Sequence, residues 1–395
     1  MAKINFCSIA EPNHLLPLLR FAESISSRGH DVNFYRDATK IEGDLNSDLY
    51  KNYPDSPSPY SDDFGDFYSD LLDNAEKNIP EYQTIMRDTE PDLNVISSMD
   101  YAAAVAAESL SQVWVVIGTN PGLLEPEGSV AYTGRGLKPL GIFNRVFNYL
   151  HNKSMNKFHG RVNQLRESVG LKPVEKAFYQ QMLQTPSYIA LTLQVMEPGT
   201  PKFPAQVDFV GPVKLKRKVN AHIDDWLESL LPPIIYVPLN HIPDSDNHVF
   251  VKRLADGLAD KSCSVLLESR DPKWDFELPE NFNHVENFDI HSSSRKIHLM
   301  IHRGNYLAQA TAMHSGLPAI IVTAGAESRE IASRSEQAGI AITMDINGLR
   351  ASRIGHTMTQ LLQEPMYRMM AERVKDRLRK RDAVKLVVGE FEERF

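Results

Sequence analysis

His14 is the first residue of the chain that could do chemistry. It lies in a polar stretch, residues 11–14, directly after a strand-like run over residues 4–9. The unperturbed pKa of a histidine is close to neutrality, so this side chain could take a proton from a substrate. The structural alternative is a histidine that hydrogen-bonds the backbone at the start of the next helix. We favour the catalytic role, because turns after the strands of a parallel sheet face the ligand-binding edge.

Three further turns are expected at such strand ends, and they follow Val237, Ile301 and Val322. The turn after Ile301 carries His302 and Arg303. A guanidinium can bind phosphate oxygens in a bidentate manner, and His241 could supply another donor. The alternative is that Arg303 only fills the cleft or forms a salt bridge there. Both interpretations of Arg303 stay open.

Metal and disulfide chemistry find little support in the sequence. The only cysteines, Cys7 and Cys263, are far apart and fall in different predicted domains. Residues 43–74 are rich in Asp, Ser, Pro and Tyr, but they lack the glycine and the terminal glutamate of a calcium loop. We interpret residues 43–74 as an irregular, solvated excursion and predict no metal site.

Alternating strand-like and helix-like segments predict an α/β fold with two domains. The first series opens with strand, helix and strand over residues 4–35 and continues with strands near residues 92–96 and 113–117. The second series begins at residues 234–237 and continues with strands at 264–267, 297–301, 319–322 and 340–344. A chain of 395 residues is long enough to form two domains, each with its own hydrophobic core. Two such sheets facing each other would form a cleft between their strand ends.

The composition of the chain indicates which kinds of binding partner to expect and where in the cell the protein resides. A net charge of -8 argues against a general nucleic-acid binder, which would carry a basic surface. No apolar run is long enough to span a bilayer, so we expect no integral membrane segment. The N-terminus runs straight into a strand pattern without a signal peptide, and we expect a cytoplasmic protein.

Residues 143–169 form a long amphipathic pattern. One side carries the apolar residues Phe143, Val146, Phe147, Leu150 and Phe158, and the other side carries basic residues. A membrane-surface helix would look similar. We favour a helix that packs on the core with a solvated basic face, because amphipathicity is the norm for surface helices.

Several segments resemble the UDP-glycosyltransferases of the macrolide and plant natural-product type. Where the family has a Gly-His…Pro turn and an Arg-Gly-His-Glu/Asp-Val helix end, this chain has Asn13-His14…Pro17 and residues 28–32. The segment His302-Arg303-Gly304 resembles the His-Gly-Gly or His-Cys-Gly motif, and the Ala-x-x-x-Gly-x-Pro that follows it matches residues 312–318. Further matches fall at residues 195–212, 278–288 and 361–368. The resemblance spans essentially the whole chain.

The resemblance implies the GT-B fold, an α/β architecture of two Rossmann-like domains that face each other across a cleft. It implies an acceptor-binding domain over residues 1–213, a linker at 214–222 and a donor-type domain over 223–377. The C-terminal helix, 378–395, is expected to pack back on the N-terminal domain. The implied ligands are a nucleotide diphosphate sugar of the UDP or TDP type and a lipophilic small-molecule acceptor. We also consider a homodimer.

By this resemblance His14 corresponds to the histidine that deprotonates the acceptor hydroxyl. The family orients this histidine with an aspartate, but the direct alignment puts Ser97 at that position. Asp100, three residues later, could substitute if the loop differs. The carboxylate matters because it fixes the tautomer and stabilises the imidazolium.

The donor side departs further from the family. The small residues of the first turn are replaced by residues 238–241, which include Asn240 and His241. His302, Arg303 and Gly304 stand where the family has His-Gly-Gly, and His302 could still meet the diphosphate as the family's histidine does. The hydroxyl and the ribose-binding glutamate align with Leu307 and Ala310, and the sugar-reading Asp-Gln pair aligns with Glu327 and Ser328.

Two main hypotheses stay open. The first is an active glycosyltransferase of natural-product biosynthesis with an altered donor site. The second is a repurposed homologue that binds no nucleotide sugar. It would run a cyclisation, isomerisation or elimination from His14, or serve as a non-catalytic partner. A peripheral membrane glycosyltransferase is a third hypothesis, based on the basic residues of segments 143–169 and 365–381.

Overall fold

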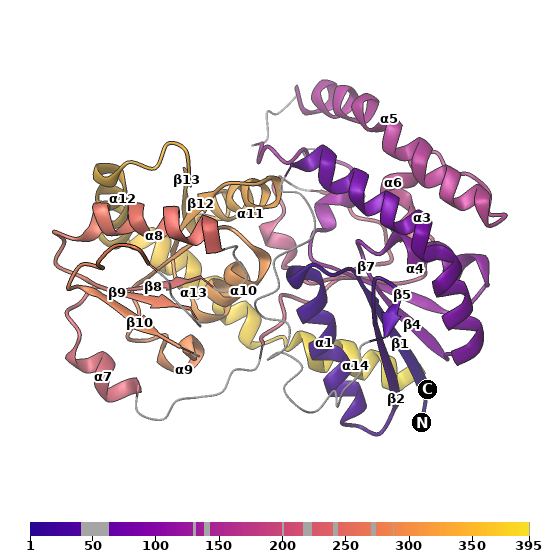
Figure 1. Cartoon of the computed structure of the whole chain (residues 1–395), viewed down its shortest axis with the longest axis horizontal. Coiled ribbons are helices and arrows are strands. Elements are labelled where there is room, and N and C mark those ends of the chain that lie inside the picture. Colours follow the sequence, from indigo (N-terminus) through magenta and orange to yellow (C-terminus); the bar gives the residue numbers. More distant parts are fainter. Residues whose placement is uncertain are drawn as a thin grey trace.

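The computed structural model describes residues 1–40, 63–128, 132–137, 143–199, 201–215, 223–239, 244–269, 274–286 and 288–394. Figure 1 shows two α/β units side by side, each built around its own sheet. Helices cover both faces of the sheets, as expected for strands that are buried on two sides. The predicted fold class, two Rossmann-like domains facing across a cleft, is confirmed.

The first sheet has seven strands in the order β3-β2-β1-β4-β5-β6-β7. All its neighbouring strands are parallel except β2 and β3, which pair antiparallel. The strands are β1 (Lys3–Ser8), β2 (Asp31–Arg36), β3 (Thr39–Lys40), β4 (Leu93–Ser97), β5 (Trp114–Gly118), β6 (Tyr188–Ala190) and β7 (Val207–Phe209). Strands β4 and β5 are buried along their whole length, as strands of a doubly covered parallel sheet should be.

The helices of this unit are α1 (Pro12–Ser26), α3 (Phe64–Thr89), α4 (Tyr101–Ser109), α5 (Asn144–Ser168) and α6 (Ala177–Gln180). Short 3-10 helices add η1 (Pro121–Leu124), η3 (Gln181–Leu183) and η4 (Gln194–Met196). Helix α1 begins directly after β1, so His14 lies in its first turn. The crossover from β1 through α1 to β2 therefore places His14 at the carboxyl end of the sheet.

The second sheet has six parallel strands in the order β10-β9-β8-β11-β12-β13. They are β8 (Ile234–Pro238), β9 (Ser264–Glu268), β10 (Phe282–Val285), β11 (Leu299–His302), β12 (Ala319–Thr323) and β13 (Ala341–Asp345). The helices are α7 (Ile223–Ser229), α8 (Asp244–Leu258), α9 (Ile290–Ser293), α10 (Tyr306–Ser315), α11 (Ala326–Gln337), α12 (Ala351–Gln363) and α13 (Pro365–Arg379). Helices α10 and α11 start at strand ends that face the first sheet.

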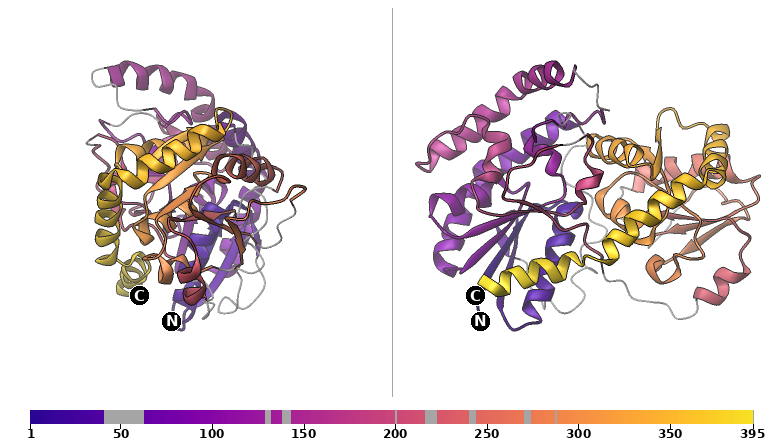
Figure 2. Two further views of the ribbon diagram at one scale, coloured as in Figure 1. Left: turned by 90° about the vertical axis from the view of Figure 1, so that its left-hand side faces the viewer. Right: turned by 180° about the vertical axis from the view of Figure 1, so that it is seen from behind.

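Helix α14 (Ala383–Arg394) returns to the first unit and packs against α1. Its Val387 and Phe391 share one buried cluster with Leu15 and Leu19 of α1. Figure 2 shows the return as a yellow helix that runs under the first sheet, with the N and C marks side by side. Residues 216–222 of the proposed linker lie outside the described residues.

The prediction of an irregular excursion over residues 43–74 is wrong for its last part, because α3 already begins at Phe64. Asp63 caps this helix by accepting the N–H groups of Gly65 and Asp66. The buried stripe that includes Tyr68, Leu72 and Ile79 packs the helix against α4 and α5. The part of the prediction that covers residues 43–62 lies outside the described residues.

The prediction of a core-facing helix over residues 143–169 holds for only part of the helix. Phe158, Val162 and Leu165 are buried, but Phe143, Val146 and Leu150 are 57–65% exposed. The apolar side chains in the first two turns of α5 are therefore largely uncovered by the described part of the chain. In the part of the chain that the structure describes, no helix has the length and apolar character needed to cross a membrane.

Candidate active site

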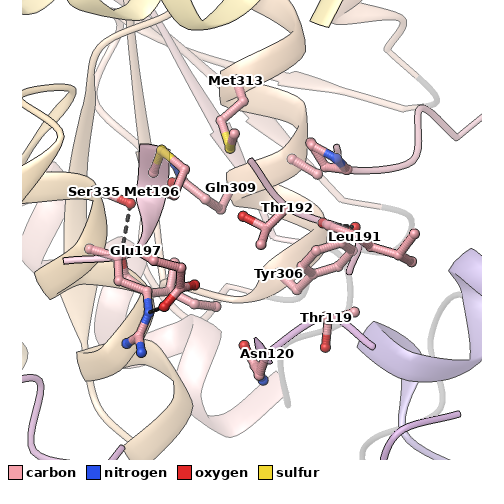
Figure 3. A pocket seen from close by; sticks show the side chains of 14 residues that line it. Thr119, Asn120, Leu191, Thr192, Met196, Glu197, Tyr306, Gln309, Met313 and Ser335 are labelled. Atoms are coloured by element: carbon pink, nitrogen blue, oxygen red, sulfur yellow. Dashed lines mark hydrogen bonds and ion pairs between the residues drawn. The ribbon is translucent and has the colours of Figure 1, made fainter. Parts of the chain in front are cut away.

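A pocket lies between the two units, where β5 and β6 end and helices α10 and α11 approach. It encloses about 450 Å³, including the part open to solvent. The first unit contributes Thr119, Asn120, Leu191, Thr192, Met196, Glu197 and Pro212, and the second contributes Tyr306, Gln309, Ala310, Met313, Ile331, Arg334 and Ser335. Figure 3 shows the side chains of the two units meeting across this space.

His14 lies behind the wall of this pocket. Its Nδ1 is 3.5 Å from the Thr119 hydroxyl, and Thr119 lines the pocket. Its Nε2 is 3.9 Å from the carboxylate of Glu11. Burial lowers the pKa of His14 to about 4, so the imidazole is neutral at physiological pH. A neutral imidazole is the form that can accept a proton.

Glu11 and Glu327 bring two carboxyl groups from the two units together around Asn13, the residue before His14. Burial, and then the charge of Glu327, raise the pKa of Glu11 well above its usual value. The Asn13 amide donates to Glu11 at 2.8 Å and to Glu327 at 3.4 Å. Glu327, predicted at a sugar-reading position, therefore also contacts the N-terminal domain.

Asp100 is tied into the core of the first unit. It is the N-cap of α4 and accepts the Ala103 N–H at 3.0 Å and the Tyr82 hydroxyl at 2.6 Å. Burial raises the pKa of Asp100 to about 7, with a further increase from Asp37, although both hydrogen bonds lower it. Among the described residues, the hydrogen-bond partners of Asp100 do not include His14. Ser97, the aligned position, is fully buried and also forms no hydrogen bond to His14.

The raised pKa of Asp100 predicts a pH-dependent stability difference. The folded state binds the proton of the Asp100 carboxyl group more tightly than the unfolded state does. The stabilisation that this proton contributes is therefore fully present below about pH 4 and is lost as pH rises through 7. Asp100→Asn keeps the cap and removes the ionisation. The free energy of unfolding of the variant, relative to the wild type, should therefore grow by about 2–3 kcal/mol from pH 5 to pH 8 in urea titrations. The matched control is Asp63→Asn at the exposed cap of α3, and an equal growth in both variants would contradict the burial argument.

His302 ends β11 and is fully buried. Its Nδ1 accepts the Gly304 N–H at 3.1 Å, so the proton of the neutral ring resides on Nε2. Burial lowers the pKa of His302 to about 4, which keeps the ring neutral. The neighbouring Gln309 side chain opposes this effect and raises the pKa, but neither the buried Nε2–H nor the Gln309 amide forms a hydrogen bond of normal geometry among the described residues. Gln309 lines the pocket, so these unsatisfied groups lie beside it.

Arg303 and Gly304 follow His302 and have different structural roles. The Arg303 guanidinium lies over the Phe250 ring of α8, 5.5 Å from its centroid. Gly304 has a φ of +77°, and a Cβ there would lie 2.9 Å from Ser328. Only glycine combines this backbone conformation with so close an approach of α11.

The other residues predicted on the donor side lie on α10, on α11 or outside the described residues. The Ser328 hydroxyl donates to Gly325 O at 2.8 Å and accepts the Ala324 N–H at 3.0 Å, so it holds the start of α11. Leu307 and Ala310 are buried on α10, and Ala310 lines the pocket. Asn240 and His241 lie outside the described residues.

An ion-pair network that sequence reasoning missed joins the two units. One carboxylate oxygen of Glu330 accepts the N–H groups of Thr133, Gly134 and Gly136 at 2.8–3.2 Å. Its other oxygen pairs with Arg334 at 2.8 Å, and Arg334 also pairs with Glu197 at 3.3 Å. Burial lowers the pKa of Arg334, but Glu197 and Glu330 more than reverse this effect. The only sequence signal was the i,i+4 spacing of Glu330 and Arg334.

Two α/β units, each with a mostly parallel sheet, and a cleft between their strand ends are the defining features of the GT-B class. Residues 256–393 match the profile of the family described as Erythromycin biosynthesis protein CIII-like, C-terminal domain. A 4'-demethylrebeccamycin synthase from Lentzea aerocolonigenes is 22% identical over 411 residues, a match that covers 97% of each chain. These matches are to proteins of natural-product glycosylation, so the resemblance that the sequence motifs indicated is confirmed.

Solved structures agree on the fold. The calicheamicin glycosyltransferase CalG4 matches with a TM-score of 0.72 at 17% identity, over 100% of this chain and 98% of its own. The spinosyn rhamnosyltransferase SpnG, complexed with thymidine diphosphate, matches with a TM-score of 0.69 at 12% identity, over 98% of this chain and 100% of its own. At these identities the likeness establishes the architecture alone.

Proposed function

We propose that this chain is a glycosyltransferase of natural-product biosynthesis that moves a sugar from a nucleoside diphosphate of the UDP or TDP type to a lipophilic small molecule. His14 acts as the base. The observation that carries the proposal is the buried Nε2–H of His302, which lies beside Gln309 but forms no hydrogen bond of normal geometry among the described residues. Leaving a buried donor unpaired costs about 1–3 kcal/mol. A diphosphate oxygen in the cleft would satisfy it.

The proposed chemistry follows from the two sides of the cleft. His14 takes the proton of the acceptor hydroxyl while the hydroxyl oxygen attacks the anomeric carbon, and the diphosphate leaves toward His302. A single displacement inverts the anomeric carbon. Thr119, 3.5 Å from His14 Nδ1, limits the rotation of the ring and lies on the pocket wall, where an acceptor would bind.

The relatives support the proposed donor class. Solved structures of similar fold include VinC in complex with DTDP and SpnG complexed with thymidine diphosphate. Others are described as calicheamicin and spinosyn glycosyltransferases. By extending these descriptions to this chain, we propose that it uses a TDP-sugar donor and a natural-product acceptor.

Specific observations also favour the second hypothesis, a homologue that uses no nucleotide sugar. Ala310 cannot replace the carboxylate that the family directs at the ribose, and the Ser328 hydroxyl is already hydrogen-bonded within α11. Under this hypothesis His14 would run acid–base chemistry on the pocket ligand alone. The two hypotheses differ in whether a nucleotide binds.

Calorimetric titration of the purified protein with TDP, UDP and their sugar conjugates tests the proposal. Binding followed by sugar transfer in an acceptor screen is the expected result, and His302→Ala should weaken nucleotide binding about 10- to 100-fold. The control is His298→Ala, which changes a histidine at the start of β11 whose Nδ1 accepts the Ile234 N–H. If no nucleotide binds the wild type, the transferase proposal fails and the second hypothesis replaces it.

A further inference from the structure

The side chain of Asn13 crosses the domain boundary to the N-terminus of α10. Its Oδ1 accepts the Leu307 N–H at 3.3 Å, and both residues are buried. The family carries glycine at this position of the turn before the histidine, so the side chain is a departure of this chain. Helix α10 has ten residues, and Leu307 lies in its first turn.

The orientation of the Asn13 amide is fixed by its neighbours. The Nδ2 group lies 2.8 Å from Glu11 and 3.4 Å from Glu327, and both carboxylates need a donor. The Oδ1 atom lies at the Leu307 N–H, which needs an acceptor. Asparagine is suited to this place because its short side chain offers both a donor and an acceptor. The resulting contact links α1, α10 and α11.

Two backbone N–H groups in the first turn of α10, those of Leu307 and Ala308, are already hydrogen-bonded to side chains. Asn305 accepts the Ala308 N–H at 2.7 Å, and Asn13 accepts the Leu307 N–H. Helix N-termini bind phosphates through such N–H groups and through the helix dipole. His302 lies three residues before the cap residue Asn305, and its buried Nε2–H forms no hydrogen bond of normal geometry among the described residues, which points independently to a ligand at this place.

We propose that Asn13 is an affinity-determining residue of the donor site: its amide oxygen occupies the position at α10 that a donor phosphate must take, so the donor binds only when Asn13 withdraws. This inference rests on the proposed transferase function. It implies that donor binding breaks the contact of Asn13 with α10 and loosens the link between the domains. It also implies that this chain binds nucleoside diphosphates more weakly than it would with the family's glycine.

The test is calorimetric titration of the full chain with TDP, UDP and inorganic pyrophosphate. Asn13→Gly, which restores the family residue, and Asn13→Ala should each tighten nucleotide binding about fivefold, because a competing hydrogen bond worth roughly 1 kcal/mol is removed. Thermal denaturation establishes that the variants are folded, and two substitutions guard against the failure of one. The matched control is Ser333→Ala, which removes a different hydrogen bond between the domains, to Leu137 O, without touching α10.

The outcomes separate the inference from the function on which it rests. Tighter binding by the Asn13 variants than by the wild type, without the same change in Ser333→Ala, supports the inference. If the wild type binds and the Asn13 variants bind equally or more weakly, the inference is overturned and the transferase function stands. If neither the wild type nor any variant binds a nucleotide, both are overturned. Equal tightening in the control would assign the effect to general domain loosening and overturn the role of Asn13.

Discussion

His14→Ala should lower kcat/KM for sugar transfer by about 10²–10⁴-fold, the usual contribution of a positioned general base. The imidazole is the neutral group placed behind Thr119 at the pocket, and alanine leaves no atom there that can accept the acceptor proton. Initial rates with the best acceptor of a screen measure the effect. Burial lowers the pKa of His14 to about 4, so wild-type kcat/KM should hold from pH 7 to about pH 5 and fall only below that.

A histidine in a comparable environment provides the control. His159 of α5 is also buried, and its Nδ1 accepts the Phe178 N–H, so His159→Ala tests the loss of a buried ring without a role in proton transfer. Full turnover by His14→Ala in a folded protein would remove His14 from the mechanism. An acid limb of the wild-type profile centred near 6.5 would instead contradict the effect of burial on its pKa.

Glu330→Ala should destabilise the protein by about 3–5 kcal/mol, the usual cost of removing one partner of a buried ion pair. The carboxylate is 3% exposed and accepts three backbone N–H groups of residues 133–136 besides pairing with Arg334. Its removal leaves these donors and the buried guanidinium with fewer acceptors. Part of the loss should appear as weaker attachment of residues 132–137 to α11, visible as faster amide hydrogen exchange there.

Ser333→Ala is the control for Glu330→Ala as well, because Ser333 lies on the same helix and makes one long hydrogen bond to the same loop. Its urea midpoint should stay close to that of the wild type. Coinciding midpoints for Glu330→Ala and Ser333→Ala would show that the ion-pair network contributes little to the union of the domains.

The sheets were the most predictable part of this fold, because their strands are short apolar runs separated by turns. Helix α11 was missed for a physical reason. Its buried face carries Glu330, Arg334 and Ser335, which are held by an ion pair and hydrogen bonds, so it shows little of the apolar period that reveals a helix. Helix α3 was obscured by its polar composition and by Pro80 within it.

Only those residues of the candidate site that directly follow a strand could be predicted from the sequence. The rule that ligands bind at strand ends located His14 and His302, because each follows a strand directly. Asp100 was offered as a partner of His14 because it lies three residues after Ser97, the position aligned with the family's aspartate, yet the start of α4 uses its carboxylate as a cap. The contact between Asn13 and Leu307 depends on how two domains are placed, and no local pattern encodes that placement.

Helix α14 has a consequence for how the chain folds as it is made. Leu15 and Leu19 of α1 belong to one apolar cluster with Val387 and Phe391, so the first unit lacks part of its core until α14 leaves the ribosome. At about 5–20 residues per second, the segment between β7 and α14 takes on the order of ten seconds to synthesise. During that interval an apolar groove on α1 stays uncovered, which makes the nascent first domain a natural client for chaperones. We therefore expect the first domain to complete its core only after the second domain has been synthesised.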